Sequence, residues 1–414
     1  MNSNQFNTVF SVIIALVSII SVLFPKLIGL AFILWIITII TGVVRKEIKI
    51  IKPTTIFILF WSLFLMYLVG VIFTNHFDIA IKNIEYKLSL LVVPLLLIFQ
   101  PKHLKFETIK WGFIYSVVLL GIAQLTYLLM NGSFSQGKSA FTSSNFSTIH
   151  HPTYFSAFAF LAMIFSIQLF SRAIEKQKKI LLFCLILFFI LIQMMCLALA
   201  GLLFLMLFFT LYACYFSFKK FGKKGLIIAI VIVPIMMVST IRLVPGFKIQ
   251  FDVSKQFWLE YMESPTNFVE SKKTYIGGNE TRLILWTATY QEILIHPFGV
   301  GTGNVDDYIE SRLNLLGQQN MALKKYNPHN QYLQTALEIG IIGSILLIII
   351  VGYTIYYGVK SNNWILVLLT LNLGFNCLFE SMLQRQSGIV FYVFWLLILT
   401  LIDSTKLLKE KKIR

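Results

Sequence analysis

One stretch, NPHNQYLQTALEIGIIG at 327–343, places a histidine among amides directly before a strongly apolar run. Asn327 is a suitable N-cap and Pro328 a suitable first helical residue, so we expect a helix that begins here with His329 in its first turn. Free N–H groups and the helix dipole at this end favour an anion. The histidine can therefore be a general base, an anion ligand or only a capping hydrogen-bonding group.

A second stretch, NETRLILWTATYQEILIHPFG at 279–299, reads as an amphipathic helix that ends at Pro297. One face of this helix is formed by four residues that recur at helical spacing, Arg282, Trp286, Tyr290 and Ile293. An arginine on a mostly apolar face needs an anionic partner. That partner is either a ligand or a carboxylate of the protein, and stacking of Arg282 on Trp286 is a further alternative.

The glycines of FGVGTGN, at 299, 301 and 303, alternate along the chain directly after this helix. Glycine lets a backbone turn tightly or approach a ligand closely, so Gly301 is a candidate ligand contact, with a plain turn as the alternative. The spacing is not that of a dinucleotide-binding loop, and no strand is expected before it.

Three further pairs of ionisable residues are candidates: His150 with His151, Asp306 with Asp307, and Glu380 with Arg385. A histidine pair suggests a metal, but no third ligand of fitting spacing accompanies it, so we predict no metal site. The aspartates could bind a divalent ion, although adjacent acids on a surface are usually solvated. The last pair lies between the final two apolar runs, where an ionisable pair at the membrane edge is either functional or structural.

Membrane helices must position these residues. Of the 414 residues, 57% are hydrophobic and only 13% are charged, and the mean hydropathy is +0.79, so a single water-surrounded core is excluded. A run of about 17 to 25 apolar residues can cross a bilayer as a helix. We count twelve apolar runs, two of them short, at about 8–24, 27–44, 53–73, 88–100, 111–130, 153–170, 180–199, 201–217, 225–243, 339–357, 364–381 and 388–402. We therefore expect an all-α, polytopic integral membrane protein.

Basic residues indicate the orientation, because Lys and Arg gather in short cytoplasmic loops. With both termini inside, the inside segments hold 21 Lys and Arg, whereas the outside segments other than the long loop hold 5. Both termini are thus predicted to be cytoplasmic. The formal charge of +17 follows largely from this asymmetry and can also contact anionic membrane lipids, so no nucleic-acid partner is predicted.

The chain divides into three regions: 1–244 with nine spans, a polar segment at 245–338, and 339–414 with three spans and a tail. Up to residue 330 the polar segment has eight basic and nine acidic residues, which predicts a folded, mainly helical periplasmic cap. The four cysteines lie in the spans without a CxxC pair, so neither a disulfide nor a zinc site is expected. The first span lacks a basic leader and is interpreted as a retained helix.

These motifs resemble those of one family. The pattern of His329, Asn330, nine residues, Gly340, two residues and Gly343 resembles the signature of bacterial O-antigen ligases and the related O-antigen polymerases. TRLILWTATYQEILIHPFGVGTGN is similar to their R-x3-W helix and glycine-rich turn, HPTYFS to a His/Asn-Pro motif, and YKLSLLVVPLLLIF to a further family segment. The resemblance covers most of the chain and is strongest over 281–343.

One family feature is missing. Where the family often has Ser-Arg-Ala-Gly at the end of the seventh span, this chain reads ALAG, with Leu199 at the arginine position. A contact to lipid phosphate through that arginine is either absent or made elsewhere, for which Arg242 and Arg385 are candidates.

The resemblance implies a membrane-embedded, helical glycosyltransferase of the GT-C-like type without a cofactor. The donor would be a glycan on undecaprenyl diphosphate and the acceptor a sugar hydroxyl of lipid A–core. They would be joined on the periplasmic side of the bacterial inner membrane, in lipopolysaccharide biosynthesis. The outward position of the candidates agrees, because no nucleotide sugar is available there. The residues expected to contact substrate are Asn330, Trp286, His151, Tyr154, Glu338, Arg385 and Gly301.

In this interpretation His329 takes the proton of the acceptor hydroxyl while that oxygen attacks the anomeric carbon and inverts it. Without a metal, Arg282 and the N-terminus of the following helix must stabilise the leaving diphosphate. Asn330 would orient the histidine or a sugar, and Glu338 would fix the helix against the cap.

Three alternatives stay open. An O-antigen or exopolysaccharide polymerase would transfer to a second lipid-linked glycan, and the sequence does not decide the acceptor. A flippase or transporter of lipid-linked glycans would need charged residues within its spans and two comparable halves. Here the span interiors are nearly uncharged and one large loop breaks the symmetry. A non-catalytic scaffold would leave His329 with a packing role.

Overall fold

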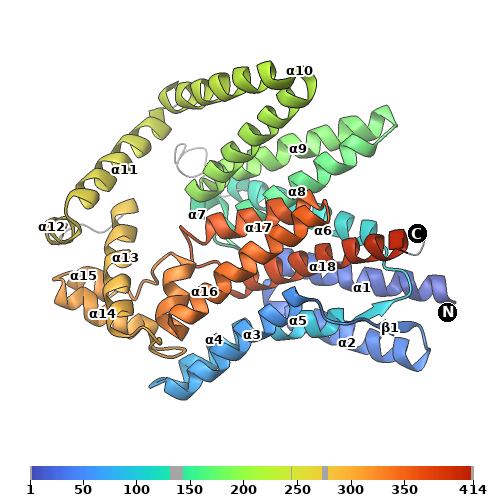
Figure 1. Ribbon diagram of the computed structural model, residues 1–414, viewed down its shortest axis with the longest axis horizontal. Coiled ribbons are helices and arrows are strands. Elements are labelled where there is room, and N and C mark those ends of the chain that lie inside the picture. The colour runs from blue at the N-terminus through green and yellow to red at the C-terminus, as the bar shows by residue number, and fades with distance from the viewer. Residues whose placement is uncertain (1, 131–142, 244, 273–277, 412–414) are drawn as a thin grey trace.

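The computed structural model describes residues 2–130, 143–243, 245–272 and 278–411, and Figure 1 shows their arrangement. The elements up to residue 130 are α1 (Ser3–Leu23), η1 (Pro25–Leu27), α2 (Ile28–Val44), β1 (Ile48–Ile50), α3 (Thr55–Gly70), η2 (Val71–Phe73), α4 (Phe77–Lys87), α5 (Ser89–Leu97), β2 (Phe99–Pro101) and α6 (Phe106–Met130). Those that follow are α7 (Ser143–Phe146), α8 (Pro152–Arg172), α9 (Lys176–Cys196), α10 (Leu199–Leu243), α11 (Pro245–Glu263), α12 (Pro265–Ser271), α13 (Gly278–Ile295), α14 (Val305–Leu315), α15 (Gln319–Ala322), α16 (Gln331–Lys360), α17 (Trp364–Asn376) and α18 (Gln386–Lys411). The described chain is all-α apart from the antiparallel ribbon of β1 and β2.

Eight helices of the described residues are long and apolar enough to cross a membrane. They are Ser3–Leu23, Pro25–Val44, Thr55–Phe73, Phe106–Met130, Pro152–Arg172, Lys176–Cys196, Leu199–Gly225 and Gln331–Lys360. Two shorter apolar helices, Trp364–Asn376 and Gln386–Ile402, correspond to the last two predicted spans. Since a helix satisfies its own backbone hydrogen bonds in lipid, these elements agree with a polytopic, helical membrane protein.

The predicted runs at 88–100 and 225–243 are not independent helices. α5 covers nine residues of the first run before β2 begins at Phe99, and nine helical residues extend only about 14 Å against a hydrocarbon core of roughly 30 Å. α5 instead continues α4, because Leu88 between them keeps a right-handed helical backbone. The second run is the far part of α10, which turns at Gly222, where φ is +62°.

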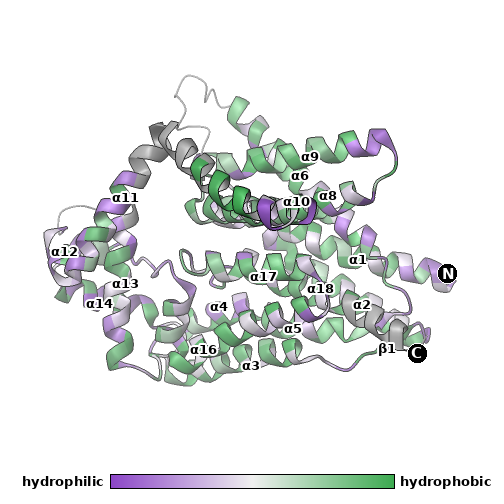
Figure 2. Cartoon of the chain, turned by 45° about the horizontal axis from the view of Figure 1, so that its top comes forward, coloured by the Kyte–Doolittle hydropathy of each residue, from purple (hydrophilic) through white to green (hydrophobic). Residues whose placement is uncertain are grey.

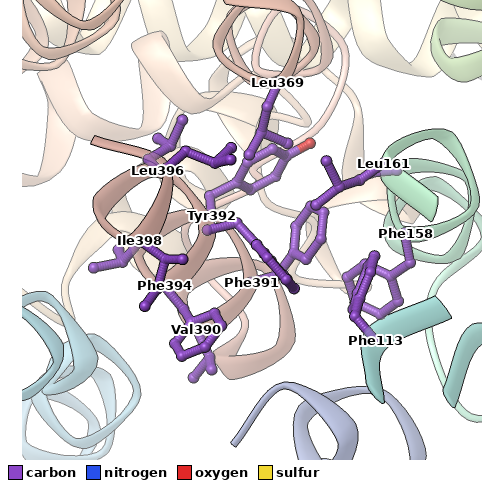
Figure 3. Packing of buried hydrophobic residues seen from close by; sticks show 14 of the residues in the cluster. Phe113, Phe158, Leu161, Leu369, Val390, Phe391, Tyr392, Phe394, Leu396 and Ile398 are labelled. Atoms are coloured by element: carbon purple, nitrogen blue, oxygen red, sulfur yellow. The ribbon is translucent and has the colours of Figure 1, made fainter. Parts of the chain in front are cut away.

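The centre of the helix bundle is formed by α8 and α18. In its most apolar window α8 is 83% buried, whereas α9 is only 28% buried, so α9 presents its apolar side chains outward, as a helix facing lipid does. Figure 3 shows Phe113, Phe158 and Phe391 meeting in the core, where the ring centres of the last two lie 4.6 Å apart. The bundle therefore packs around aromatic side chains from α6, α8 and α18.

The polar segment α11–α15 gathers at one end of the molecule, and the start of α1 and β1 lie at the opposite end (Figure 1). Figure 2 shows that hydrophilic residues are concentrated in this segment. α12–α15 and the start of α16 share a separate cluster of buried side chains that includes Val269, Ile284, Leu285, Ile309, Leu313 and Leu337. The segment thus has a hydrophobic core of its own. Its periplasmic side stays a prediction.

α16 is broken into a polar part at 331–338 and an apolar part at 341–360. At the break, Gly340 has φ +86° and ψ 165°. The backbone groups freed there bond to the glycine-rich loop after α13. The bonds are Val300 N to Leu337 O at 2.8 Å, Gly301 N to Glu338 O at 3.1 Å, and Ile341 N to Pro297 O at 3.0 Å. Main-chain hydrogen bonds therefore hold the break in place.

The glycines at this break make the close approach possible. Gly299, Gly301 and Gly303 have φ of +89°, +95° and +98°, a region that L side chains rarely adopt. A Cβ on Gly340 would lie 2.8 Å from the carbonyl carbon of Phe298. The missing side chain of Gly340 thus leaves room for the loop after α13. The break turns this glycine out of the helical face, so its close contact is not with another helix.

Candidate functional site

Three predicted residues meet around the carboxylate of a fourth, Glu380. Nδ1 of His329 lies 3.2 Å from each carboxylate oxygen, and Nδ1 of His151 lies 3.8 Å from Oε2. The guanidinium of Arg282 interacts electrostatically with Glu380 and His151. The four side chains come from α13, from the segments before α8 and α16, and from the loop between α17 and α18. The fold therefore builds this cluster from elements far apart in the sequence.

The charge of Glu380 is fixed by its surroundings. Burial alone raises the pKa of this carboxyl, but the hydrogen bond with His329 and the positive charges of His329, His151 and Arg282 outweigh burial and lower the pKa to about 2. The side chain is only 8% exposed, and a buried carboxylate persists only with such partners. Glu380 consequently stays ionised at physiological pH, where it can accept a hydrogen bond from His329 and attract the guanidinium of Arg282.

His151 is the less firmly held of the two histidines. Burial lowers the pKa of His151, and the negative charge of Glu380 opposes this shift only in part. Its Nδ1 is buried and has no hydrogen-bond partner among the described residues. Buried polar atoms without a partner are uncommon. His151 therefore offers a group that a ligand hydroxyl could bind.

His329 lies before the first helical turn, so the predicted helix start at Pro328 was wrong. Asn330 is the N-cap of α16, and its Oδ1 accepts the N–H groups of two first-turn residues at 3.0 and 3.1 Å. The N–H of Gln331 bonds to the carbonyl of Cys377, and that of the fourth residue to the carbonyl of Asn330. All four N–H groups of the helix start are thus occupied, and no free N–H remains there for an anion.

The backbone of His329 itself is unusual. Its φ is +46°, a left-handed conformation that few residues other than glycine adopt. Asn327 supports it, because Oδ1 of Asn327 accepts the backbone N–H of His329 at 2.9 Å. A strained conformation that the surroundings maintain is frequent at functional sites.

Three of the residues predicted to contact substrate hold the loops of the site in place. Their polar groups donate to backbone carbonyls: Trp286 Nε1 to Pro328 O at 2.9 Å, Asn330 Nδ2 to Leu378 O at 3.2 Å, and Tyr154 OH to Ser381 O at 3.2 Å. These bonds tie α13, α16 and α8 to the two loops that carry His329 and Glu380. The geometry gives these three side chains a positioning role, while direct contact with substrate stays a prediction.

Glu338 belongs to a second charged cluster. Its Oε1 lies 3.3 Å from Nζ of Lys87, and both side chains are 1% exposed. Lys87 also donates to Gln384 at 2.9 Å and lies over the ring of Tyr67. Oε2 of Glu338 accepts from Gln334 at 3.3 Å and from Gln384 at 2.8 Å. The side chain of Glu338 therefore fixes α16 to the end of α4, while its backbone carbonyl accepts from Gly301 of the cap segment.

The remaining predicted residues take separate places. Gly301 packs against the backbone of Phe73, so its position is that of a tight turn. Arg385 is exposed and repels His151 electrostatically, while Glu380, its predicted partner, pairs with His329 instead. Leu199 begins α10.

Other ionisable candidates are engaged within the protein. Nε2 of His150 bonds to the carbonyl of Val22 at 2.7 Å and Nδ1 to Ser387 Oγ at 3.1 Å. Asp307 pairs with His76 at 2.5 Å. Within the described ranges, no group of three or more His, Cys, Asp or Glu side chains could hold a metal ion.

The sequence did not predict two features of the site, namely the partner of Glu380 and the role of Lys87. Glu380 was paired with its near neighbour Arg385 because the two are close in sequence, whereas its true partner is 51 residues away. Lys87 is one of the five Lys and Arg residues in the short outside segments, and it is the second residue of the family-like segment YKLSLLVVPLLLIF. A lysine directly before an apolar run of that kind was the available signal.

The fold and the site together define a class of protein. It is a polytopic helical membrane protein in which a buried glutamate lies beside an arginine and two partly exposed histidines. This cluster lies where the bundle meets a folded polar segment. Residues 155–348 match the model of the O-antigen ligase family. This match confirms the resemblance of the motifs, and over this stretch the chain belongs to the family of O-antigen ligases and related polymerases. It is a multi-pass protein of a bacterial membrane.

A relative of this chain is known from Haemophilus influenzae. This uncharacterized protein is 25% identical over 196 residues, which cover 43% of the chain and 46% of the relative. The chain thus matches less than half of the relative's length. Of the clustered residues, Arg282 and His329 lie within the family match, whereas His151 and Glu380 lie outside it.

Proposed function

We propose that the protein is an O-antigen ligase, which transfers a glycan from undecaprenyl diphosphate to a sugar hydroxyl of lipid A–core. The observation that carries this proposal is the hydrogen-bonded pair of His329 and Glu380, with Arg282 close enough to interact with the same carboxylate. The family match supplies the reaction class. The apolar helices around the site suit substrates that are both anchored in a membrane.

His329 serves as the general base. With Nδ1–H donated to Glu380, Nε2 is the nitrogen left to accept a proton, and the carboxylate stabilises the imidazolium that forms. The side chain is 25% exposed, so a substrate hydroxyl can approach it. The acceptor proton passes to Nε2 while the acceptor oxygen bonds to the anomeric carbon. The bond from that carbon to the diphosphate oxygen breaks with its electron pair, and attack from the opposite face inverts the carbon.

Arg282 stabilises the leaving diphosphate. A guanidinium stays protonated in proteins and can form two parallel hydrogen bonds to phosphate oxygens. In the free protein Glu380 provides the negative charge beside it, which keeps this partly buried arginine in place until the donor binds. The charge that develops on the diphosphate is then met by a fixed cation, without a metal ion.

A transfer assay tests the reaction. Purified protein in liposomes receives undecaprenyl-diphosphate glycan with labelled lipid A–core, or the donor alone. Lengthening of the labelled lipid A–core supports the ligase. A growing ladder of lipid-linked glycan without the acceptor identifies the polymerase. If neither product forms with folded protein, the glycosyltransferase proposal is rejected in favour of a transporter or scaffold.

A further inference from the structure

A cavity of about 570 Å³ lies beside the Glu380 cluster, within the roughly 300–1,000 Å³ typical of small-ligand sites. Its walls come from η1, α4, the start of α14 and the segment 384–387. Asn327 also lines it and accepts the backbone N–H of His329 at 2.9 Å. The cavity therefore reaches to within two residues of the proposed base, while the described side chains around Glu380 do not line it.

The charge of the cavity wall is positive. Lys26, Lys325 and Arg385 line it against a single acid, Asp306. Lys325 is 59% exposed and already meets two carboxylates at 3.5 and 3.7 Å. For Lys26 and Arg385, by contrast, no carboxylate of the described chain lies within ion-pair distance. Two cations without acidic partners on a concave surface favour an anionic ligand.

The wall also offers hydrogen-bonding groups suited to a sugar. Gln334 lines the cavity and is only 5% exposed, yet its Oε1 is buried without a partner among the described residues. An amide oxygen in that situation accepts a hydrogen bond when a hydroxyl reaches it. Asn83 and Tyr86 of α4 add an amide and an aromatic ring to the same wall.

The buried Lys87–Glu338 pair stiffens this wall. Both Gln334 and Gln384 line the cavity and donate to Oε2 of Glu338, at 3.3 and 2.8 Å. Since Glu338 is itself neutralised by Lys87, the amide groups are held in one arrangement. Such preorganisation lowers the cost of ordering a bound sugar.

We propose that this cavity binds the acceptor, and that the accepting sugar or its neighbour carries an anionic group, a phosphate or a carboxylate. Lys26 and Arg385 bind that group, Gln334 accepts from a sugar hydroxyl, and the accepting hydroxyl reaches His329 past Asn327. This inference rests on the proposed function and adds a place and a chemical class for its acceptor. A phospholipid headgroup has the same anionic chemistry, so the experiment separates the two sources.

Binding to the full-length protein in detergent tests the cavity without turnover. Calorimetry compares three soluble oligosaccharides of equal length, one phosphorylated, one with a uronic acid and one neutral. We expect at least one anionic oligosaccharide to bind about tenfold more tightly than the neutral one. The Lys26→Gln/Arg385→Gln variant should lose this preference. Lys82→Gln, on the exposed side of α4 and outside the cavity, should keep it.

The inference is overturned if the wild-type protein binds all three oligosaccharides equally, or if the preference survives in the double variant. It is also overturned if phosphatidylglycerol in the micelles displaces the anionic oligosaccharide, because the cavity then belongs to a lipid headgroup.

Turnover separates this inference from the proposed function. In the transfer assay the double variant should raise KM for the acceptor about tenfold and leave KM for the donor unchanged. Transfer by the double variant with an unchanged acceptor KM would reject the cavity as the acceptor site. Absence of transfer by the wild-type protein would reject the ligase proposal, and the binding comparison would still decide the cavity.

Discussion

Two charged clusters of the described chain, that of Glu380 and that of Glu338, each contain a buried carboxylate but leave different groups accessible. In the Lys87–Glu338 pair both side chains are 1% exposed and meet further protein groups. In the other cluster only the carboxylate of Glu380 is deeply buried, while the two histidines next to it are 25% and 34% exposed. A buried ion pair whose charged groups are all bonded within the protein joins helices. A buried carboxylate beside partly exposed histidines instead forms a site that substrate can reach.

Removal of the base should have the largest effect. His329→Ala is expected to lower transfer by about 10²–10⁴-fold, the usual contribution of a general base, with little change in the melting temperature because the side chain is half-buried. His103→Ala is the matched control, since His103 is exposed and lies next to β2, away from the site. Near-normal turnover of the His329 variant would show that the Glu380 cluster is not catalytic and, like the Lys87–Glu338 pair, is structural.

Disruption of the buried pair should instead act on stability. Lys87→Met leaves the Glu338 carboxylate buried without its cation, which costs about 3–5 kcal/mol. Lys87→Met/Glu338→Leu removes both charges and should recover most of that loss. Thermal unfolding in detergent measures both variants, and the exposed Lys82→Met on the same helix should change stability by about 0.5 kcal/mol or less. A double variant no more stable than the single one would contradict a self-contained pair.

The role of Glu380 can be separated from that of the base. Glu380→Gln keeps a hydrogen-bonding side chain but removes the charge, and we expect transfer to fall about 10–100-fold, as for other groups that orient a histidine. Since the pKa of Glu380 is about 2, this carboxylate does not titrate between pH 5 and 8. Loss of its charge destabilises the imidazolium, so the acid limb of the pH–rate profile should move to lower pH. An unchanged profile would indicate a purely structural carboxylate.

The break in α16 directly follows Glu338. We expect a substitution at the break to lower stability by less than the loss of Lys87 does. Gly340→Ala places a Cβ at φ +86°, close to Phe298, and holding an L residue in this region, with ψ at 165°, costs about 1–3 kcal/mol. Gly352→Ala is its control, because a Cβ at Gly352 has no atom within 4 Å. Equal melting temperatures for the two variants would show that the break tolerates a side chain.

The smallest expected effect is that of a chelator. If the cations of the Glu380 cluster are protein groups alone, EDTA should leave the rate of transfer unchanged in the same liposome assay. Loss of activity that added divalent ions restore would replace Arg282 by a metal as the partner of the diphosphate.

The sequence predicted the helical membrane architecture well because long apolar runs are a local property. A helix was expected within 279–299 that ends at Pro297, and α13 is found at Gly278–Ile295. The start of α16 was misplaced because Asn327 and Asn330 are both good caps, and only the contact of Asn330 with the loop after α17 decides between them. Tertiary contacts therefore overruled a valid local signal.

The site was predictable only in part for a related reason. His329 and Arg282 were found from motifs, but their meeting point at Glu380 depends on how α13, α16 and α17 pack. Likewise Lys87 and Glu338 are 251 residues apart, and no spacing rule connects residues at such a distance. Periodicity reports which face of one helix a residue occupies, and it carries no information about the element that faces it.

The break at Gly340 also separates the polar start of α16 from its apolar, membrane-spanning part. Membrane helices tilt to match the thickness of the bilayer, and a continuous helix would transmit that tilt to the polar residues at its end. Here the loop after α13 bonds to Leu337 and Glu338 before the break and to Ile341 directly after it. A change in the tilt of the apolar part must therefore deform these bonds before it displaces residues 331–338, and we expect the histidine at the head of α16 to be shielded from changes in lipid chain length.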